Sequence, residues 1–433
     1  MGARKKRGEW LIMKTKAVRL YGTMDLRLEE FELPEMQEDE IIAKVVSDSL
    51  CASSYKAAKQ GTAHKRVPND AGTNPVIIGH EFCGEIVEVG SKWADQFKPG
   101  DRFIIQPALN YPGRTLDAPG YSFHYIGGDA TYVLIPHHVM DMNCLIPYDG
   151  DNFFGGSLTE PYSCVIGTFK AMYHTTYGSY VHHMGICEGG NMAMLAGNGP
   201  MGQAAIDYII HCDRRPSLLV VTGRRQEQLD KLASLLTVED AKANGVELHY
   251  FNTSCENPVE ELKALTGGKG YDDVLVFAPA APMVEMGDAI LANDGCLNFF
   301  SGPSDKDFKA LFNFYNVHYA STHIVGTSGG NIEDMKDAVA MMNAGRINPA
   351  ILVSHVGGLN AVPEATMHLP EIPGPSGKKL IYTGVDMPLT AIDDFEKLGE
   401  SDPFFKKLDE ICKAHNGLWS TEAEKYLLET KSC

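Results

Sequence analysis

Residues 191–212 read NMAMLAGNGPMGQAAIDYIIHC, and this stretch decides the class of fold. Its first seven residues are typical of a buried strand, and residues 204–212 have the pattern of a helix. Between them lies a G-x-G-x-x-G pattern. Its three glycines permit a tight turn, a close approach of a pyrophosphate to the backbone, and tight packing of the helix on the strand. We expect a dinucleotide-binding loop rather than a glycine-rich turn without ligand, formed by Gly197, Asn198, Gly199, Pro200, Met201 and Gly202.

The end of the next predicted strand indicates which dinucleotide is bound. Enzymes selective for NAD carry Asp or Glu there, which binds the ribose hydroxyls. This chain has Gly223, Arg224 and Arg225 instead. Glycine removes the repelling carboxylate, and arginines can pair with a 2′-phosphate. We therefore expect a preference for NADP(H) over NAD(H), with Arg224 as the main contact and Arg225 as the second. The alternative is a pair of solvated loop arginines.

Changes in sequence pattern divide the chain into five parts. Up to about residue 150, short apolar runs between Gly, Pro, Asn and Asp predict a small β-barrel. After about residue 160, alternating strands and helices predict a parallel sheet with helices on both faces. The stretches DPFFKKLDEICKAH and STEAEKYLLE predict a helical tail. The expected parts are an N-terminal arm (1–12), the first part of a barrel-containing catalytic domain (13–174), a dinucleotide-binding domain (175–345), a return segment to the catalytic domain (346–385) and a C-terminal extension (386–433).

Composition and charge limit the partners of the protein. The 433 residues include 38 Lys and Arg against 56 Asp and Glu, which gives a net charge of -18. Such a field repels polyanions and disfavours nucleic acid or an anionic membrane as partner, leaving a small molecule as the expected ligand. No apolar run is long enough to span a membrane, and the basic N-terminus lacks a signal-peptide core. Ten cysteines without a Cys-x-x-Cys pair favour reduced thiols and a cytoplasmic location.

Four residues outside the predicted dinucleotide domain suit a metal ion. Cys51 follows a predicted strand, His80 and Glu81 follow Gly79, and Glu160 precedes the second domain. One thiolate, one imidazole and one carboxylate are typical of a tetrahedral zinc ion with an open fourth position for water or substrate. Each of these residues alone is more often a packing or helix-start residue. Their joint occurrence beside a dinucleotide loop predicts a catalytic zinc site.

Taken together, these motifs resemble the zinc-dependent medium-chain alcohol dehydrogenase/reductase family over about residues 14–385. The matching segments are CASS from Cys51, GHEFCGEIVEVG from Gly79, Glu160-Pro161 and the loop GNGPMG. The resemblance implies an α/β protein with a GroES-like β-barrel catalytic domain and a doubly wound Rossmann domain. It further implies that Cys51 and His80 bind zinc, that Glu160 is the third ligand or binds the water on the zinc, that Glu81 can move onto the metal, and that Ser53 relays a proton.

Two departures from the family pattern bear on the metal. Many relatives bind a structural zinc with four closely spaced cysteines, but residues 108–128 contain none. We therefore expect one catalytic zinc per subunit and no structural zinc. Ser54 stands where the family usually has Asp, three residues after the first ligand. The negative charge lost at this position is expected to come from Glu81.

Within the family, the sequence is most similar to the L-sorbose 1-phosphate reductase group of polyol and sugar-phosphate dehydrogenases. The likeness rests on CASSYKAAKQGTAHKRVP, AGNGPMGQAAIDYIIHCDRRP and the extended tail. It implies hydride transfer between NADP(H) and a ketose phosphate, a polyol phosphate or a related polyol, by a homodimer or homotetramer. His64, Lys65 and Arg66 are the candidate phosphate contacts, with a solvated loop as the alternative. The competing functions are a zinc-free quinone or enone reductase and a non-catalytic NADPH-binding regulator.

Overall fold

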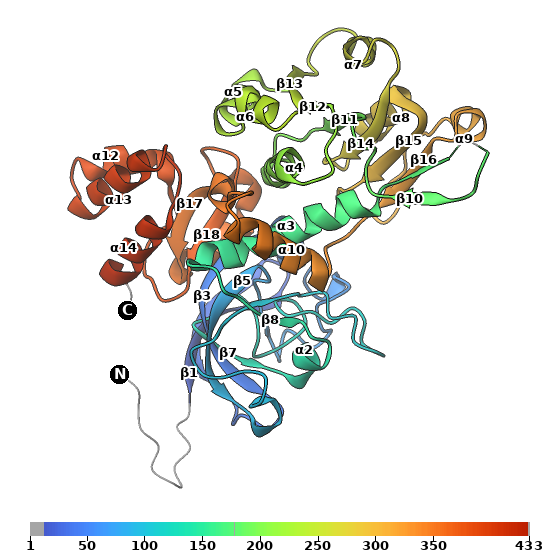
Figure 1. Cartoon of the computed structure of the whole chain (residues 1–433). Helices are drawn as coiled ribbons and strands as arrows, with labels where there is room; N and C mark the ends of the chain where they lie inside the picture. Colours follow the sequence, from blue (N-terminus) through green and yellow to red (C-terminus); the bar gives the residue numbers. More distant parts are fainter. Residues whose placement is uncertain (1–12, 177, 432–433) are drawn as a thin grey trace. The chain divides into compact units, whose positions relative to one another are not determined.

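The computed structural model describes residues 13–176 and 178–431, so the predicted arm at residues 1–12 lies outside the described residues (Figure 1). The described chain forms two compact units. The first contains the chain up to Glu160 together with Val353–Gly374 and the segment from Lys378 onward; the second contains Pro161–Leu352 and Pro375–Gly377. The sequence had suggested boundaries after residues 174 and 345. In the structure the first division falls inside helix α3 (Phe153–Ala171).

The first unit is built around mainly antiparallel strands that form the predicted barrel, with one parallel pair, β17 and β18. A sheet of three strands has the order β2 (Asp25–Glu32), β1 (Lys14–Gly22), β4 (Val76–Ile77). A larger sheet has the order β19 (Thr390–Ala391), β17 (Val353–Gly358), β18 (Lys378–Tyr382), β3 (Ile41–Leu50), β5 (Phe82–Val89), β6 (Arg102–Ile105), β8 (Leu145–Pro147), and β7 (Tyr132–Ile135) also pairs with β3. The return segment, irregular in sequence, thus supplies two strands, β17 and β18, and the C-terminal extension supplies β19. β18 pairs directly with β3.

Buried apolar side chains from the sheets and the helix α1 (Ala52–Gln60) form the core of this unit, among them Val18, Ile78, Tyr121 and Ile381. Helix α1 ends at Gly61, whose φ of +53° favours glycine. The other helices are α2 (His137–Asp141), α11 (Val362–Met367), α12 (Phe395–Gly399), α13 (Pro403–Ala414) and α14 (Thr421–Lys431). The last three confirm the predicted helical extension.

The second unit is a doubly wound parallel sheet, which confirms the predicted Rossmann fold. Its strand order is β13 (Glu247–Asn252), β12 (Leu218–Gly223), β11 (Asn191–Leu195), β14 (Tyr271–Val276), β15 (Leu291–Phe299), β16 (His323–Gly326). The order reverses beside β11, the position at which such sheets bind ligands. The helices are α4 (Pro200–His211), α5 (Gln226–Leu235), α6 (Val238–Ala243), α7 (Pro258–Leu265), α8 (Ala281–Ile290), α9 (Phe314–Tyr319) and α10 (Ile332–Asn343), and a hairpin joins β9 (Tyr173–Thr175) to β10 (His182–Met184).

In the described part of the chain, none of the helices combines the length and hydrophobicity that a bilayer span requires.

The glycine-rich loop connects β11 to α4 as predicted, and its glycines have different surroundings. A Cβ atom on Gly202 would collide with the carbonyl of Gly197, because helix and strand approach closely there. A Cβ atom on Gly199 would meet no atom within 4 Å. Gly199 is the N-cap residue of α4 and has φ of -89°, which any residue can adopt. The third glycine of the pattern is therefore needed for packing, whereas the second leaves the backbone open.

This difference predicts opposite results for two small substitutions. Gly202→Ala should lower the free energy of unfolding by about 1–3 kcal/mol, because the added methyl group overpacks a closed contact. Gly199→Ala is the matched control and should leave stability within about 0.5 kcal/mol of the unchanged protein. Urea denaturation followed by circular dichroism measures both. Equal stabilities for the two variants would contradict the proposed packing role of Gly202.

Candidate metal centre and cofactor loop

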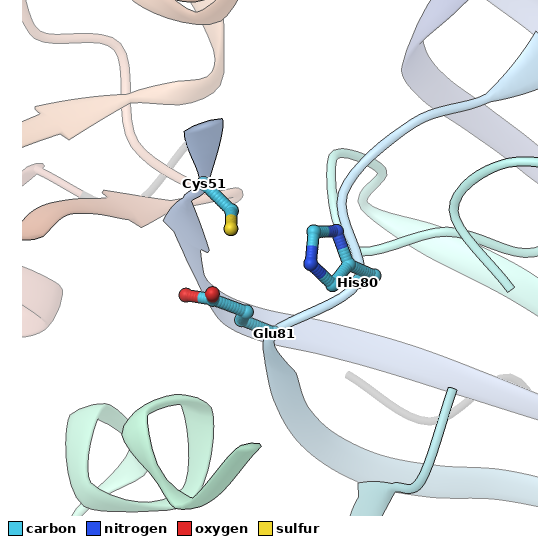
Figure 2. Close-up of side chains that lie close together, drawn as sticks. All are labelled: Cys51, His80 and Glu81. Atoms are coloured by element: carbon cyan, nitrogen blue, oxygen red, sulfur yellow. The ribbon is translucent and has the colours of Figure 1, made fainter. Parts of the chain in front are cut away.

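Three potential ligand side chains meet in the first unit, at the ends of neighbouring strands. Cys51 follows β3 and is the N-cap residue of α1, while His80 and Glu81 lie just before β5. β3 and β5 pair with Asp48 opposite Phe82, and this register brings the three residues together. Their ligand atoms all lie within 4.8 Å of one another, and Figure 2 shows Cys51 on one segment and His80 and Glu81 on another.

His80 is a buried and neutral imidazole. Its Nδ1 lies 3.3 Å from Ser54 Oγ and its Nε2 lies 3.2 Å from Tyr121 Oη. Burial lowers the pKa of His80 to about 4, against the opposing charge of Glu81. The ring therefore carries no charge at neutral pH, as a metal ligand must. Ser54, at the position where an Asp was expected, thus contacts the ring of the candidate ligand His80.

Glu81 forms a buried ion pair with Lys378 of β18. The Lys378 Nζ atom lies 2.5 Å and 2.6 Å from the two carboxylate oxygens, and Ser49 Oγ also donates to this carboxylate. Burial favours the neutral acid, but Lys378, His80 and the bond from Ser49 together hold the pKa of Glu81 below its ordinary value. Burial likewise opposes the charge on Lys378, yet Glu81 keeps the pKa of this ammonium above its ordinary value.

The thiol of Cys51 has the surroundings expected of a metal ligand. Burial, followed by the charge of Glu81, raises its pKa to about 12, although Lys378 acts in the opposite direction. Without a cation the thiol therefore keeps its proton, and a divalent ion is what would stabilise the thiolate here. A neutral imidazole, a thiol and carboxylates within reach are the donor set of a catalytic zinc site, so the residues fit this ion.

Glu160 and Ser53, the other predicted site residues, lie near this cluster. Glu160 stands within α3, and its charge contributes to the raised pKa of Cys51, after burial and Glu81. It is not a member of the three-residue group whose ligand atoms lie within 4.8 Å of one another. The Oγ atom of Ser53 lies 3.1 Å from the sulfur of Cys51.

Three further residues of the site escaped sequence reasoning. Tyr121 and Lys378 come from distant segments, and nothing in their local sequence marks them as functional. Asp48 accepts a hydrogen bond from the Glu81 backbone N–H at 3.1 Å. The buried Asp129 also lies beside Gly79, and burial raises the pKa of Asp129 to about 7. Burial, together with the charges of Asp129 and Glu81, also raises the pKa of Asp48.

The basic segment after α1 lies beside Tyr121. The guanidinium carbon of Arg66 stands 5.3 Å from the centre of the Tyr121 ring, on which His64 also stacks. Arg66 also acts on the candidate metal cluster. Burial, then Lys378 and Arg66, lower the pKa of His80, whereas Glu81 raises it. Its Nε atom is buried and has no hydrogen-bond partner among the described residues. Lys65 is exposed.

In the second unit, the predicted cofactor residues follow β11 and β12. Gly197 N donates to Thr222 O at 3.0 Å, which fixes the loop to the neighbouring strand. Asn198 Nδ2 donates to Gln228 Oε1 at 2.8 Å. Pro200 and Met201 form the first turn of α4, and Gly223 ends β12. Arg224 and Arg225 follow it with exposed side chains, and neither forms an ion pair within the described part of the chain.

Comparison with known proteins identifies the family of the chain. Residues 37–143 match the family model of the alcohol dehydrogenase GroES-like domain, and residues 200–344 match that of the zinc-binding dehydrogenase. The chain is 51% identical to mannitol-1-phosphate 5-dehydrogenase of Aliivibrio fischeri over 96% of its own length and 98% of the relative. It is also 51% identical to L-sorbose 1-phosphate reductase of Klebsiella pneumoniae, over 96% and 97%. The chain belongs to the zinc-dependent medium-chain dehydrogenase/reductase family.

Solved structures show the same fold. The 2R,3R-butanediol dehydrogenase of Bacillus subtilis superimposes with a TM-score of 0.67 at 21% identity, covering 85% of this chain and 99% of that enzyme. A zinc-binding dehydrogenase of Sinorhizobium meliloti, bound to NADP, gives 0.68 at 20% identity, with coverage of 86% and 99%. Membership of the family makes the protein an oxidoreductase that uses zinc and a nicotinamide cofactor. Part of this chain has no counterpart in these two structures.

The geometry predicts that Cys51 is required for metal binding. The purified protein should contain zinc, and Cys51→Ser should lower its zinc content at least tenfold, because the thiolate is the strongest anionic donor of the cluster. Cys187→Ser, at a half-buried cysteine of the second unit, is the matched control and should keep its zinc. Elemental analysis after gel filtration measures both. A zinc content unaffected by Cys51→Ser would show that the ion binds elsewhere.

Proposed function

We propose that this protein is a zinc-dependent oxidoreductase that transfers hydride between NADP(H) and a ketose phosphate or polyol phosphate. The observation that carries the proposal is the cluster of Cys51, His80 and Glu81 with the cation of Arg66 beside it. The sequence identity of 51% to two enzymes that are named for a polyol phosphate and a ketose phosphate supports this substrate class.

We assign Cys51, His80 and Glu160 as the protein ligands of one zinc ion per subunit. Lys378 already pairs with the carboxylate of Glu81, so Glu81 serves mainly as a neighbouring charge. When bound, zinc supplies a Lewis acid for the oxygen of the reacting carbonyl or alcohol. Residues 108–128 are held by the buried Tyr121 and contain no cysteine, which supports the absence of a structural zinc.

Ser53 is the proposed proton relay. Its hydroxyl lies 3.1 Å from Cys51 Sγ and also interacts with the phenol of Tyr121. In reduction of a ketone, hydride from C4 of the nicotinamide adds to the carbonyl carbon and the oxygen needs a proton. Ser53 can donate this proton and recover one from water or a neighbouring hydroxyl.

Arg66 is the proposed phosphate contact. A phosphate needs a positive partner, and a guanidinium binds it through two parallel hydrogen bonds. The unpartnered Nε of Arg66 is one donor that such an anion would satisfy. Lys65 is exposed beside it, and His64 has its pKa lowered to about 4 by burial and the charge of Arg66, so it contributes no positive charge at neutral pH.

NADPH oxidation with matched ketoses and ketose phosphates tests the reaction and the role of Arg66. We expect turnover of the phosphorylated substrates. Arg66→Ala should raise KM for them at least tenfold, the loss expected for a charge-assisted contact of about 1.5–3 kcal/mol. KM for the unphosphorylated ketose should change little, and Lys65→Ala is the control. The proposal fails if neither ketoses nor their phosphates are reduced, or if Arg66→Ala affects both kinds of substrate alike.

The choice of cofactor depends on Arg224 and Arg225. Their exposed side chains follow Gly223 at the end of β12, where NADP carries its 2′-phosphate in Rossmann folds. Arg224→Ala should lower the ratio of kcat/KM for NADPH to that for NADH about tenfold or more. Arg215→Ala, at an arginine that precedes β12, should leave the ratio unchanged. An unaltered ratio in Arg224→Ala would refute the assignment.

We also propose that the enzyme is a cytoplasmic homo-oligomer. All nine cysteines that the structure describes are free thiols, as in a reducing compartment. Exposed apolar side chains of the second unit gather on the β9–β10 hairpin, α9 and the edge strand β16: Tyr180, Val181, Met184, Phe314, Tyr315, Tyr319 and Ile324. The Tyr173 ring stacks on His323 at 4.0 Å and joins the hairpin to β16. An open strand edge flanked by apolar side chains favours pairing with a second copy.

Sedimentation equilibrium tests this assembly. The mass should be at least twice 47.4 kDa. The double substitution Tyr315→Asp with Tyr319→Asp should shift it towards the monomer, because charges would be placed in an apolar contact. Leu265→Asp, at an exposed apolar residue outside this surface, is the control. A wild-type protein of monomeric mass would contradict the proposal.

A further inference from the structure

The C-terminal extension reaches the start of the helix that carries Glu160. Glu424 of α14 is only 3% exposed. Its Oε1 accepts a hydrogen bond from Phe153 N at 2.7 Å, and its Oε2 accepts one from Phe154 N at 2.8 Å. The Tyr382 hydroxyl donates to the same carboxylate at 2.8 Å. A buried acid from the end of the chain is therefore saturated by donors from α3 and β18.

These contacts satisfy the first turn of α3. The first N–H groups of a helix lack partners within it, and an anion beside them is stabilised by the helix dipole. Asn152 covers one such group, because its Oδ1 accepts from Gly155 N at 2.7 Å. Glu424 accepts the hydrogen bonds of the two preceding N–H groups, those of Phe153 and Phe154. Asn152 Nδ2 also donates to Thr421 Oγ1 at 3.2 Å, so α14 holds the start of α3 at two points.

The start of α3 is also in close contact with the strands β3 and β5. Ser47 Oγ on β3 donates to Phe153 O at 2.8 Å. A Cβ atom on Gly156 would collide with the side chain of Cys83 on β5. The first turns of α3 thus pack on β3 and β5, and the N–H groups at the start of the helix are hydrogen-bonded to Glu424. Glu160 follows Phe153 by two helical turns, so a shift or tilt at the first turn is passed on to its carboxylate.

The extension also contacts the strand that carries Lys378. The Trp419 Nε1–H donates to Tyr382 Oη at 2.8 Å, and Trp419 is buried. Tyr382 and Lys378 are four residues apart on β18, and positions with this spacing share one face of a strand. Glu424 and Trp419 therefore bind β18 through Tyr382. The same strand carries Lys378, which pairs with Glu81.

We propose that Glu424 is a positioning residue of the metal centre, which sets the place of Glu160 by binding the first turn of α3. The proposal rests on the proposed function, because it takes Glu160 as a zinc ligand. The C-terminal extension is then a part of the catalytic apparatus, and its contribution is the strength of zinc binding. Partners that orient metal ligands contribute about 10–100-fold to metal affinity.

Zinc affinity of the full-length protein tests this role. Glu424→Gln keeps the size of the side chain but removes its charge and turns an amide donor towards one of the backbone N–H groups. We expect about tenfold weaker zinc binding, measured by competition with a chromophoric chelator, and altered absorption bands of the cobalt-substituted protein. Glu429→Gln is the matched control, because Glu429 lies on the same helix with an exposed side chain 3.9 Å from Lys425. Its zinc affinity should equal that of the wild type.

A double-mutant cycle shows whether Glu424 acts through Glu160. Glu160→Gln alone should weaken zinc binding, and adding Glu424→Gln to it should weaken binding no further. Unchanged zinc affinity and cobalt spectrum in a folded Glu424→Gln protein would overturn the inference, and so would full additivity in the cycle. A wild-type protein that binds no zinc would instead refute the proposed function. If Glu424→Gln does not fold, Tyr382→Phe removes one bond to the same carboxylate, and the inference requires weaker zinc binding there too.

Discussion

The buried ion pair between Glu81 and Lys378 is the interaction on which the metal centre depends. Both side chains are almost completely buried, so removing either would leave an uncompensated charge in the interior, at a cost of about 3–5 kcal/mol. Lys378 offsets the negative charges of Glu81 and Glu160 near the thiol of Cys51. The two partners come from β18 and from the segment before β5. The site is therefore complete only when the return segment has paired with β3.

A second constraint is the packing of residues 108–128 on the turn that carries His80. A Cβ atom on Gly120 would collide with the carbonyl of Gly79, so the two segments are in direct contact. This contact places Tyr121 between the His80 ring and the guanidinium of Arg66. The buried Tyr121 ring also packs in the apolar core of the first unit and so holds this segment. The Tyr121 side chain thus contacts both the proposed zinc ligand His80 and the proposed phosphate contact Arg66.

The sequence was sufficient for the elements whose partners are close along the chain. The strand, loop and helix around residues 191–212 were predicted with their order, because the pattern of apolar residues and glycines is local there. The strand before Cys51 and the helix that ends at Gly61 were predicted for the same reason. Glu160-Pro161 is typical of a helix start, yet it lies inside α3, where tertiary packing overrides the local preference. β17 and β18 were missed because their pairing partners are distant in sequence.

The same distinction separates the two sites of the protein. The cofactor loop uses backbone geometry from one continuous stretch, so a few glycines suffice to identify it. The proposed metal centre takes side chains from the end of β3, the turn before β5, the Tyr121 segment, α3 and β18, which are far apart along the chain. A sequence motif can identify candidate ligands such as Cys51 and His80. The groups that set their protonation and orientation, such as Lys378 and Tyr121, can be identified only from the folded structure. Glu424 extends this network to the last helix, because the first turn of α3 needs acceptors that no nearby residue other than Asn152 supplies.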